Sequence, residues 1–103
     1  MPILLTLGLS ELSVLIKFES DDVYRAIYLE HLTVKELTEK IIERSDIKKP
    51  VSKVIRKFKR SDKKSIVVRM EDDVVKDMQE EQDILVQTED NEDGQSVTLV
   101  LVF

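Results

Sequence analysis

The chain has 103 residues, of which 42% are hydrophobic and 36% charged, and a formal net charge of −5. A chain of this length forms one small domain, and its low glycine and proline content argues against disorder. It contains no cysteine and one histidine, which excludes disulfides, thiolate nucleophiles and Cys/His zinc sites and leaves little for acid–base catalysis. We therefore expect no enzyme, and no catalytic, cofactor or metal site.

The first nine residues, MPILLTLGL, are apolar. They fall far short of the roughly 20 residues that cross a bilayer, and they lack the basic flank and cleavage pattern of a signal peptide. We expect residues 1–12 to form an N-terminal apolar segment, as an extra strand, a linker or a docking segment, and we expect no membrane partner. Residues 13–103 are then the folded domain.

Two strands are predicted after this segment. Residues 13–19 (SVLIKFE) alternate between apolar and polar in the manner of a half-buried strand. Residues 23–30 (VYRAIYLE) are largely apolar on both faces. The side chains that we assign to the core face of these strands are Val14, Ile16, Phe18, Val23, Ile27 and Leu29.

A helix is predicted from Thr33 onward. Thr33 and Glu36 form a T-x-x-E capping box, in which a hydroxyl and a carboxylate accept from backbone N–H groups that would otherwise be unpaired. Leu37 and Ile41 recur at helical spacing and predict a stripe that faces the core. The helix should end near residues 45–47, before the Lys-Lys-Pro break at 48–50.

The second half of the chain predicts mainly strands. We expect strands at residues 51–59, 65–70, 83–88 and 96–103, a short helical turn at 72–79, and a turn at 91–94 in which Gly94 takes a positive φ angle. One main helix packed on one face of a mixed sheet, in this order, indicates an α+β fold of the ubiquitin-like β-grasp type.

Charge is unevenly distributed along the chain. Residues 48–64 hold nine Lys and Arg against one acid, and residues 71–93 hold eleven acids against one lysine. Such blocks are typical of solvated faces, although they could also complement each other, within the fold or between two copies. The net charge and the near absence of aromatic residues in the basic block argue against direct nucleic-acid binding.

The remaining candidates for a catalytic, metal or binding site have only weak support from the sequence. His31, between a strand and the helix, is interpreted as a surface or loop residue. The acidic run at residues 71–73 lacks the spacing and the glycine of a calcium loop. Met70 and Met78 are interpreted as core residues.

The sheet face opposite the predicted core face is also rich in apolar side chains. This is harder to explain, because one helix covers only one face. Either this face associates with another copy of the chain, or the N-terminal segment or loops cover it. A one-residue error in strand register would exchange the two faces. The predicted self-association residues are Leu15, Tyr24, Ala26, Tyr28, Val100 and Val102.

Three stretches, DDVYRAIYLEHLTVKELTEKI, SIVVRMEDDVVKDMQEEQDILV and SVTLVLVF, resemble the C-terminal domain of the grainyhead-like transcription factors, most closely the branch of the alpha-globin and late-simian-virus promoter factors. The resemblance runs from Val14 to Val102. It departs from the family in the loop at residues 60–65, which lacks a glycine that members usually have there, so the geometry of that turn is open.

The resemblance implies a ubiquitin-like oligomerisation domain at residues 13–103. It would belong to a nuclear transcription factor whose immunoglobulin-like DNA-binding domain lies elsewhere. The implied partners are the chain itself and related family members, with DNA contacted only through other domains.

Two other functions fit parts of the sequence. A protein modifier of the ubiquitin type would need a Gly-Gly tail, which Val102 and Phe103 do not provide. A Phox/Bem-type adaptor pairs front to back, with a lysine of its first strand on an acidic loop; Lys17 and residues 71–83 are the candidates here. The adaptor is the alternative that stays open.

Overall fold

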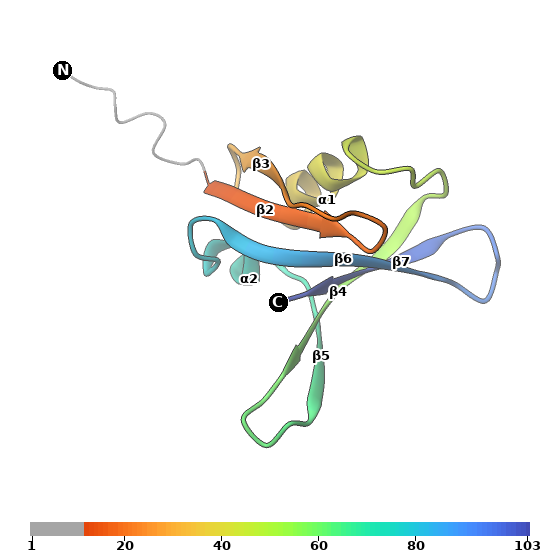
Figure 1. Ribbon diagram of the computed structural model, residues 1–103. Coiled ribbons are helices and arrows are strands. Elements are labelled where there is room, and N and C mark those ends of the chain that lie inside the picture. Colours follow the sequence, from red (N-terminus) through yellow and green to blue (C-terminus); the bar gives the residue numbers. More distant parts are fainter. Residues whose placement is uncertain (1–11) are drawn as a thin grey trace.

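The computed structural model describes residues 12–103, and the expected role of residues 1–11 lies outside this range. The described part of the chain forms one mixed sheet with two helices on the same side of it (Figure 1). This confirms the α+β class. Neither helix in this range is long and apolar enough to span a membrane.

The sheet has six strands in the order β3-β2-β6-β7-β4-β5. Two neighbouring pairs, β2 with β6 and β4 with β7, are parallel, and the other three pairs are antiparallel. The strands are β2 (Leu12–Phe18), β3 (Arg25–Leu29), β4 (Val51–Lys59), β5 (Ser65–Arg69), β6 (Gln82–Asp90) and β7 (Val97–Val102).

The main helix, α1 (Val34–Glu43), begins where the sequence predicts. The hydroxyl of Thr33 accepts from the Glu36 N–H at 3.1 Å. The reciprocal half of the expected capping box is different, because the Glu36 carboxylate accepts from the N–H groups of Glu30 and His31 instead of that of Thr33. It therefore ties the end of the preceding strand to the first turn of the helix.

A shorter helix, α2 (Asp72–Lys76), lies between β5 and β6. The Asp72 carboxylate accepts from the Val34 N–H at 2.9 Å, so the two helices are joined at the start of α1. Both helices contribute to the core, through Leu37 and Ile41 of α1 and Val75 of α2, all fully buried. Met70 and Met78 are also core residues, as predicted.

The core lies between the helices and one face of the sheet, here called the first face. Four of the predicted core side chains of β2 and β3 are buried there, and Phe18 is half-buried against them, whereas Val23 is 65% exposed. The prediction for Val23 is wrong because β3 begins only at Arg25, so Val23 lies in the preceding bend. The sheet residues of the core cluster are Leu12, Val14, Ile16, Ile27, Leu29, Ile84, Val86, Leu99 and Leu101.

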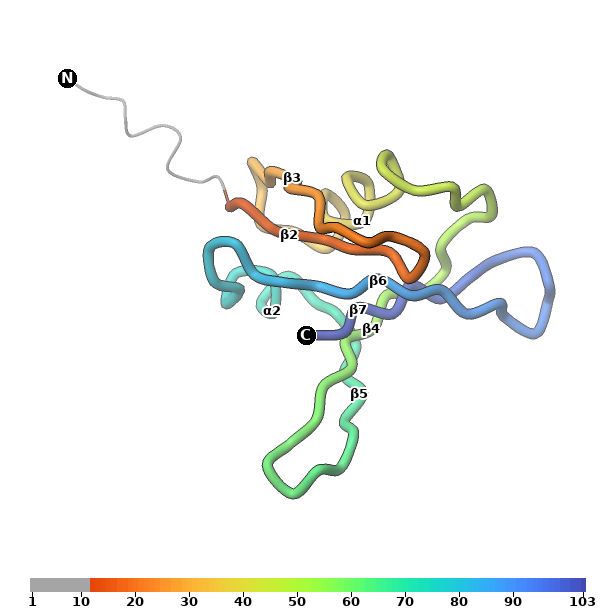
Figure 2. The backbone as a smooth tube through the Cα atoms, in the orientation of Figure 1, coloured from red at the N-terminus to blue at the C-terminus, as the bar shows by residue number. Residues whose placement is uncertain are grey.

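The hairpin formed by β4 and β5 extends away from the rest of the molecule (Figures 1 and 2). The strands pair from Ile55 with Arg69 to Lys59 with Ser65. In the turn between them the Arg60 N–H donates to the Lys64 carbonyl and the Lys63 N–H donates to the Arg60 carbonyl, and Lys63 adopts a φ angle of 69°. This is the loop that lacks the glycine, and a lysine occupies the left-handed conformation instead.

Candidate self-association face

The side of the sheet turned away from both helices is here called the second face. Strand register places Leu15 beside Ala26, and Ser13 beside Tyr28, across the β2–β3 pair. Because neighbouring residues in register share a face, and side chains alternate along each strand, the predicted self-association residues of these strands lie together. Val100 and Val102 of β7 belong to the same face, since Leu15 and Lys17 pair with Asp83 and Leu85, and Leu85 pairs with Val102.

The predicted self-association residues differ in their solvent exposure. Tyr24 and Tyr28 are 46% and 57% exposed, and Ala26 is also exposed. Leu15 and Val102 are half-buried. Val100 is only 1% exposed, because β6 and β4 flank it with Gln87 and Ile55. A partner can therefore contact the side chains of Tyr24, Ala26 and Tyr28, whereas the side chain of Val100 is buried within the sheet.

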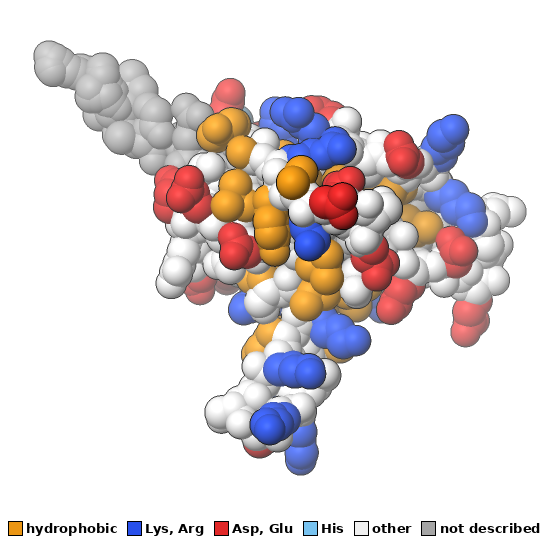
Figure 3. Space-filling view, in the orientation of Figure 1, with side chains coloured by type: hydrophobic (Ala, Val, Ile, Leu, Met, Phe, Trp, Pro, Cys, Tyr) orange, Lys and Arg blue, Asp and Glu red, His pale blue; other side chains and the backbone are white. Residues whose placement is uncertain are grey.

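The sequence analysis missed the apolar side chains of β5. Val67 is 58% exposed, and its register with Lys57 places it on the second face. Val68 is 36% exposed and points to the opposite side of the hairpin. The alternation in SIVVRM is a signal that could have identified Val67. Figure 3 shows that hydrophobic side chains lie across this side of the molecule, between patches of charge.

Charged side chains of the second face come from both ends of the sheet. Lys17 lies next to Tyr24, with its Nζ 5.6 Å from the centre of the ring, and Glu19 accepts from the Gln87 amide at 3.3 Å. At the β4–β5 end of the same face, Lys53, Lys57 and Arg69 lie with Val67. The face is thus apolar in its middle and at both edges, with charges between.

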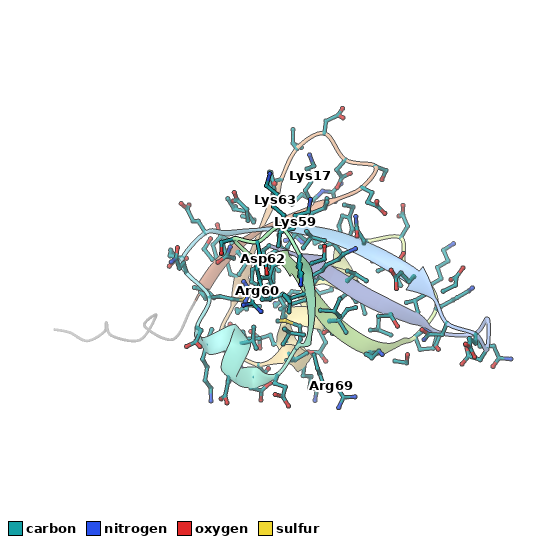
Figure 4. The ribbon with its side chains drawn as sticks, turned by 90° about the horizontal axis from the view of Figure 1, so that it is seen from below. Lys17, Lys59, Arg60, Asp62, Lys63 and Arg69 are labelled. Carbon is teal, nitrogen blue, oxygen red and sulfur yellow. The ribbon has the colours of Figure 1, made fainter. Side chains whose placement is uncertain are left out.

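The cations of the basic block have few partners of their own. Within residues 12–103, the one ion pair formed by residues 48–64 joins Lys49 to Asp90 at 3.3 Å. At the hairpin tip, Lys59, Arg60 and Lys63 gather near Asp62, while Arg69 lies apart from them (Figure 4). Asp62 accepts from the Lys64 N–H at 3.0 Å, so this acid shapes the turn.

Arg56 is an exception among these cations because it packs on the first face. Its guanidinium lies 4.6 Å from the ring centre of Phe58 and 4.2 Å from that of Phe103. Its Nε is buried and has no hydrogen-bond partner. Stacking therefore holds this side chain at the base of the hairpin.

His31 contacts the first turn of α1. Its Nδ1 lies 3.1 Å from Glu36 Oε1. Hydrogen bonds from the backbone and the ring of His31 lower the pKa of Glu36, with a smaller contribution from the Glu30 N–H. Residues 12–103 hold no group of three or more His, Cys, Asp or Glu side chains that could bind a metal ion.

Comparison with known proteins identifies the domain. Residues 10–101 match the family described as "GRHL1-like, C-terminal domain". The chain belongs to this grainyhead-like family. The resemblance to the grainyhead-like family is thereby confirmed.

Two curated relatives show how the grainyhead-like domain relates to longer proteins. Human Grainyhead-like protein 2 homolog is 33% identical over 93 residues, which cover 90% of this chain and 14% of the relative. The Grainyhead-like protein 2 homolog of Xenopus tropicalis is 35% identical over 85 residues, which cover 82% of this chain and 13% of the relative. The chain thus spans a small part of their length. No solved structure matches it.

Proposed function

We propose that this domain is a self-association module of a nuclear grainyhead-like transcription factor. Its role is to pair DNA-binding domains that lie elsewhere in the full-length protein. The observation that carries the proposal is the placement of both helices on the first face, which leaves Tyr24, Tyr28 and Val67 exposed on the second face. Tyrosine is enriched at protein interfaces, and exposed apolar side chains on a sheet face that no helix covers indicate an interaction surface.

Pairing gives such a protein an advantage without any chemistry in this domain. When two linked DNA-binding domains meet two half-sites, the second binding event becomes intramolecular, and the overall affinity rises by a large factor. Two-fold pairing also matches the symmetry of a palindromic site. DNA contacts belong to other domains in this proposal, and related family members that share the second face are further candidate partners.

We propose the ubiquitin-like roll as the fold type. Three features support it: an antiparallel β2–β3 hairpin, the helix α1 that follows the hairpin and covers one face, and β6 running parallel beside β2. In this chain β7 lies between β6 and β4, which widens the sheet to six strands.

The mass of the purified 12.0 kDa chain in solution tests the proposal. Light scattering on a sizing column should give twice this mass over a range of about 1 to about 100 micromolar, which spans moderate affinities. Apolar contacts should keep the dimer intact at high salt. A mass of one chain at every concentration would contradict self-association.

A second sample, residues 12–103, tests whether the N-terminal segment covers the second face instead. All the described strands and helices are kept in this shorter chain. Dimerisation that appears only after removal of residues 1–11 would show that this segment competes with the partner. Equal dimerisation of both samples would show that the second face is open in the full chain.

A further inference from the structure

Strand register divides the charges of the second face into two groups. The half built from β3, β2 and β6, here called the tyrosine half, carries Asp83 and Glu89 against Lys17, together with Glu19, which binds the Gln87 amide just beyond the end of β2. The half built from β4 and β5, here called the hairpin half, carries four cations and no acid. These cations are Lys53, Lys57, Lys59 and Arg69.

Each half also has an exposed apolar part at its outer edge. Tyr24 and Tyr28 lie at the β3 edge, and Val67 lies at the β5 edge. Five strand spacings of about 4.8 Å separate the two edges, so they are about 24 Å apart. One copy therefore cannot bring its own hairpin half onto its own tyrosine half, but a second copy can.

Two-fold symmetry leaves two simple ways to stack the second faces of two copies. If the axis runs across the strands, each half meets the same half of the partner, and four cations face four cations. If the axis runs along the strands, the hairpin half of each copy meets the tyrosine half of the other. Only the second arrangement places opposite charges together, at both ends of the interface at once.

We propose that the partner on the second face is another copy, turned so that its β4–β5 hairpin lies over the β3 and β2 strands of the first. This rests on the proposed self-association. In this arrangement Val67 packs toward the partner's tyrosines, and Lys57 and Lys59 lie over the half that carries the partner's Glu19 and Asp83. The extension of the hairpin from the body of the molecule (Figure 1) gives it the reach for this contact.

The charges select this orientation more than they strengthen the dimer. Complementary charges at an interface steer encounter and penalise wrong registers, whereas apolar anchors supply most of the affinity. The tip of the hairpin is suited to this role, because Lys59, Arg60 and Lys63 are exposed. Its turn is held by Asp62 and by the backbone hydrogen bond from Arg60 to Lys64.

Charge reversal on the full 103-residue chain tests the arrangement. The first variant is Lys57→Glu/Lys59→Glu, the second is Glu19→Lys/Asp83→Lys, and the third combines all four changes. All four side chains are exposed, and thermal unfolding followed by circular dichroism checks that each variant folds. A matched control, Lys35→Glu/Lys48→Glu, changes the net charge by the same amount as the first variant at exposed residues outside the sheet.

Each two-site variant should raise the dimer dissociation constant about tenfold or more at low salt, because like charges then face each other. The four-site variant should return to within about threefold of the wild type, since its reversed halves are again complementary. The control should change the constant by less than about threefold. At about 1 M salt, where the screening length is about 3 Å, these differences should vanish.

The outcomes separate this inference from the proposed function. A dimeric wild type whose two-site variants dimerise as well as it does overturns the arrangement and leaves self-association standing. A monomeric wild type overturns both. If the first variant still dimerises but loses binding to a labelled DNA duplex that the wild type binds, then the hairpin half serves nucleic acid, and the inference is wrong.

Discussion

The ammonium group of Lys17 lies 5.6 Å from the centre of the Tyr24 ring. This cation shields one of the two exposed tyrosines of the second face, whereas Tyr28, which is 57% exposed, has no cation over its ring in the described range. Tyr28 is therefore the more accessible apolar anchor of the proposed interface.

The first prediction is that Tyr28→Asp weakens self-association about tenfold or more, because it places a charge in an apolar contact. Sedimentation over a concentration series measures the dissociation constant. Tyr28→Phe is the matched control, since it keeps the ring, and it should change the constant little. Equal dimerisation of the Asp variant and the wild type would remove Tyr28 from the interface.

Lys17→Glu distinguishes the sheet-face dimer from front-to-back pairing of the Phox/Bem type. A front-to-back assembly needs this lysine on a partner's acidic residues, so the change should abolish it. A sheet-face dimer with the hairpin over the tyrosine half should not be weakened, because the new acid faces the partner's cations. Complete dissociation of the Lys17→Glu variant would favour the adaptor.

The second prediction concerns the Glu36 carboxylate, which joins β3 to α1. Glu36→Gln should lower the free energy of unfolding by about 1 kcal/mol near neutral pH, because a charged acceptor of two backbone N–H groups is lost. Denaturant unfolding at a series of pH values measures the difference.

The sign of the pH dependence follows from the lowered pKa of Glu36. Its usual value is 4.5, so the stability contributed by the folded carboxylate is fully present above that pH. It is lost as the pH falls below 4.5 and through the lower pKa of the folded state. The two proteins should converge in acid, and a difference that grows there would contradict the assignment.

The third prediction concerns Lys63, whose φ angle is 69°. A left-handed conformation costs a residue with a Cβ about 1 kcal/mol or more, and glycine avoids this cost. Lys63→Gly should therefore raise the free energy of unfolding by about 0.5 to 1 kcal/mol. Lys64→Gly, one residue on and outside the positive-φ region, is the control and should have no stabilising effect.

The fourth prediction concerns Arg56, which stacks on Phe58 and Phe103. Arg56→Lys should lower the free energy of unfolding by about 1 kcal/mol, because an ammonium group cannot replace a planar guanidinium between two rings. Arg60→Lys, at an exposed position of the hairpin, should be nearly neutral. Equal effects of the two changes would show that the stacking contributes nothing.

Local sequence patterns were enough to predict most of the helices and strands. The T-x-x-E signal at Thr33 located the start of α1, and the alternation in SVLIKFE identified Val14 and Ile16 as core residues. Val23 was misassigned, because the apolar pattern starts in the bend that precedes β3. Periodicity does not show where a strand begins when apolar residues also occupy the turn before it.

The candidate face was only partly predictable. Alternation placed Tyr24 and Tyr28 correctly outside the core, but it could not show that neighbouring strands enclose Val100. Nor could it show that β4 and β5 extend from the body and add Val67 to the same face. Both facts depend on which strands are neighbours.

The sequence by itself determined the α+β class, the family and the two-sided apolar character of the strands, because these follow from periodicity, capping and motif within short stretches of chain. Only the tertiary structure decided the sheet order, in which β7 lies between β6 and β4. That order, set by long-range pairing and burial, gathers the cations of the hairpin on one half of a face and the carboxylates on the other. Such an arrangement depends on the register between strands far apart in sequence, which no local pattern encodes.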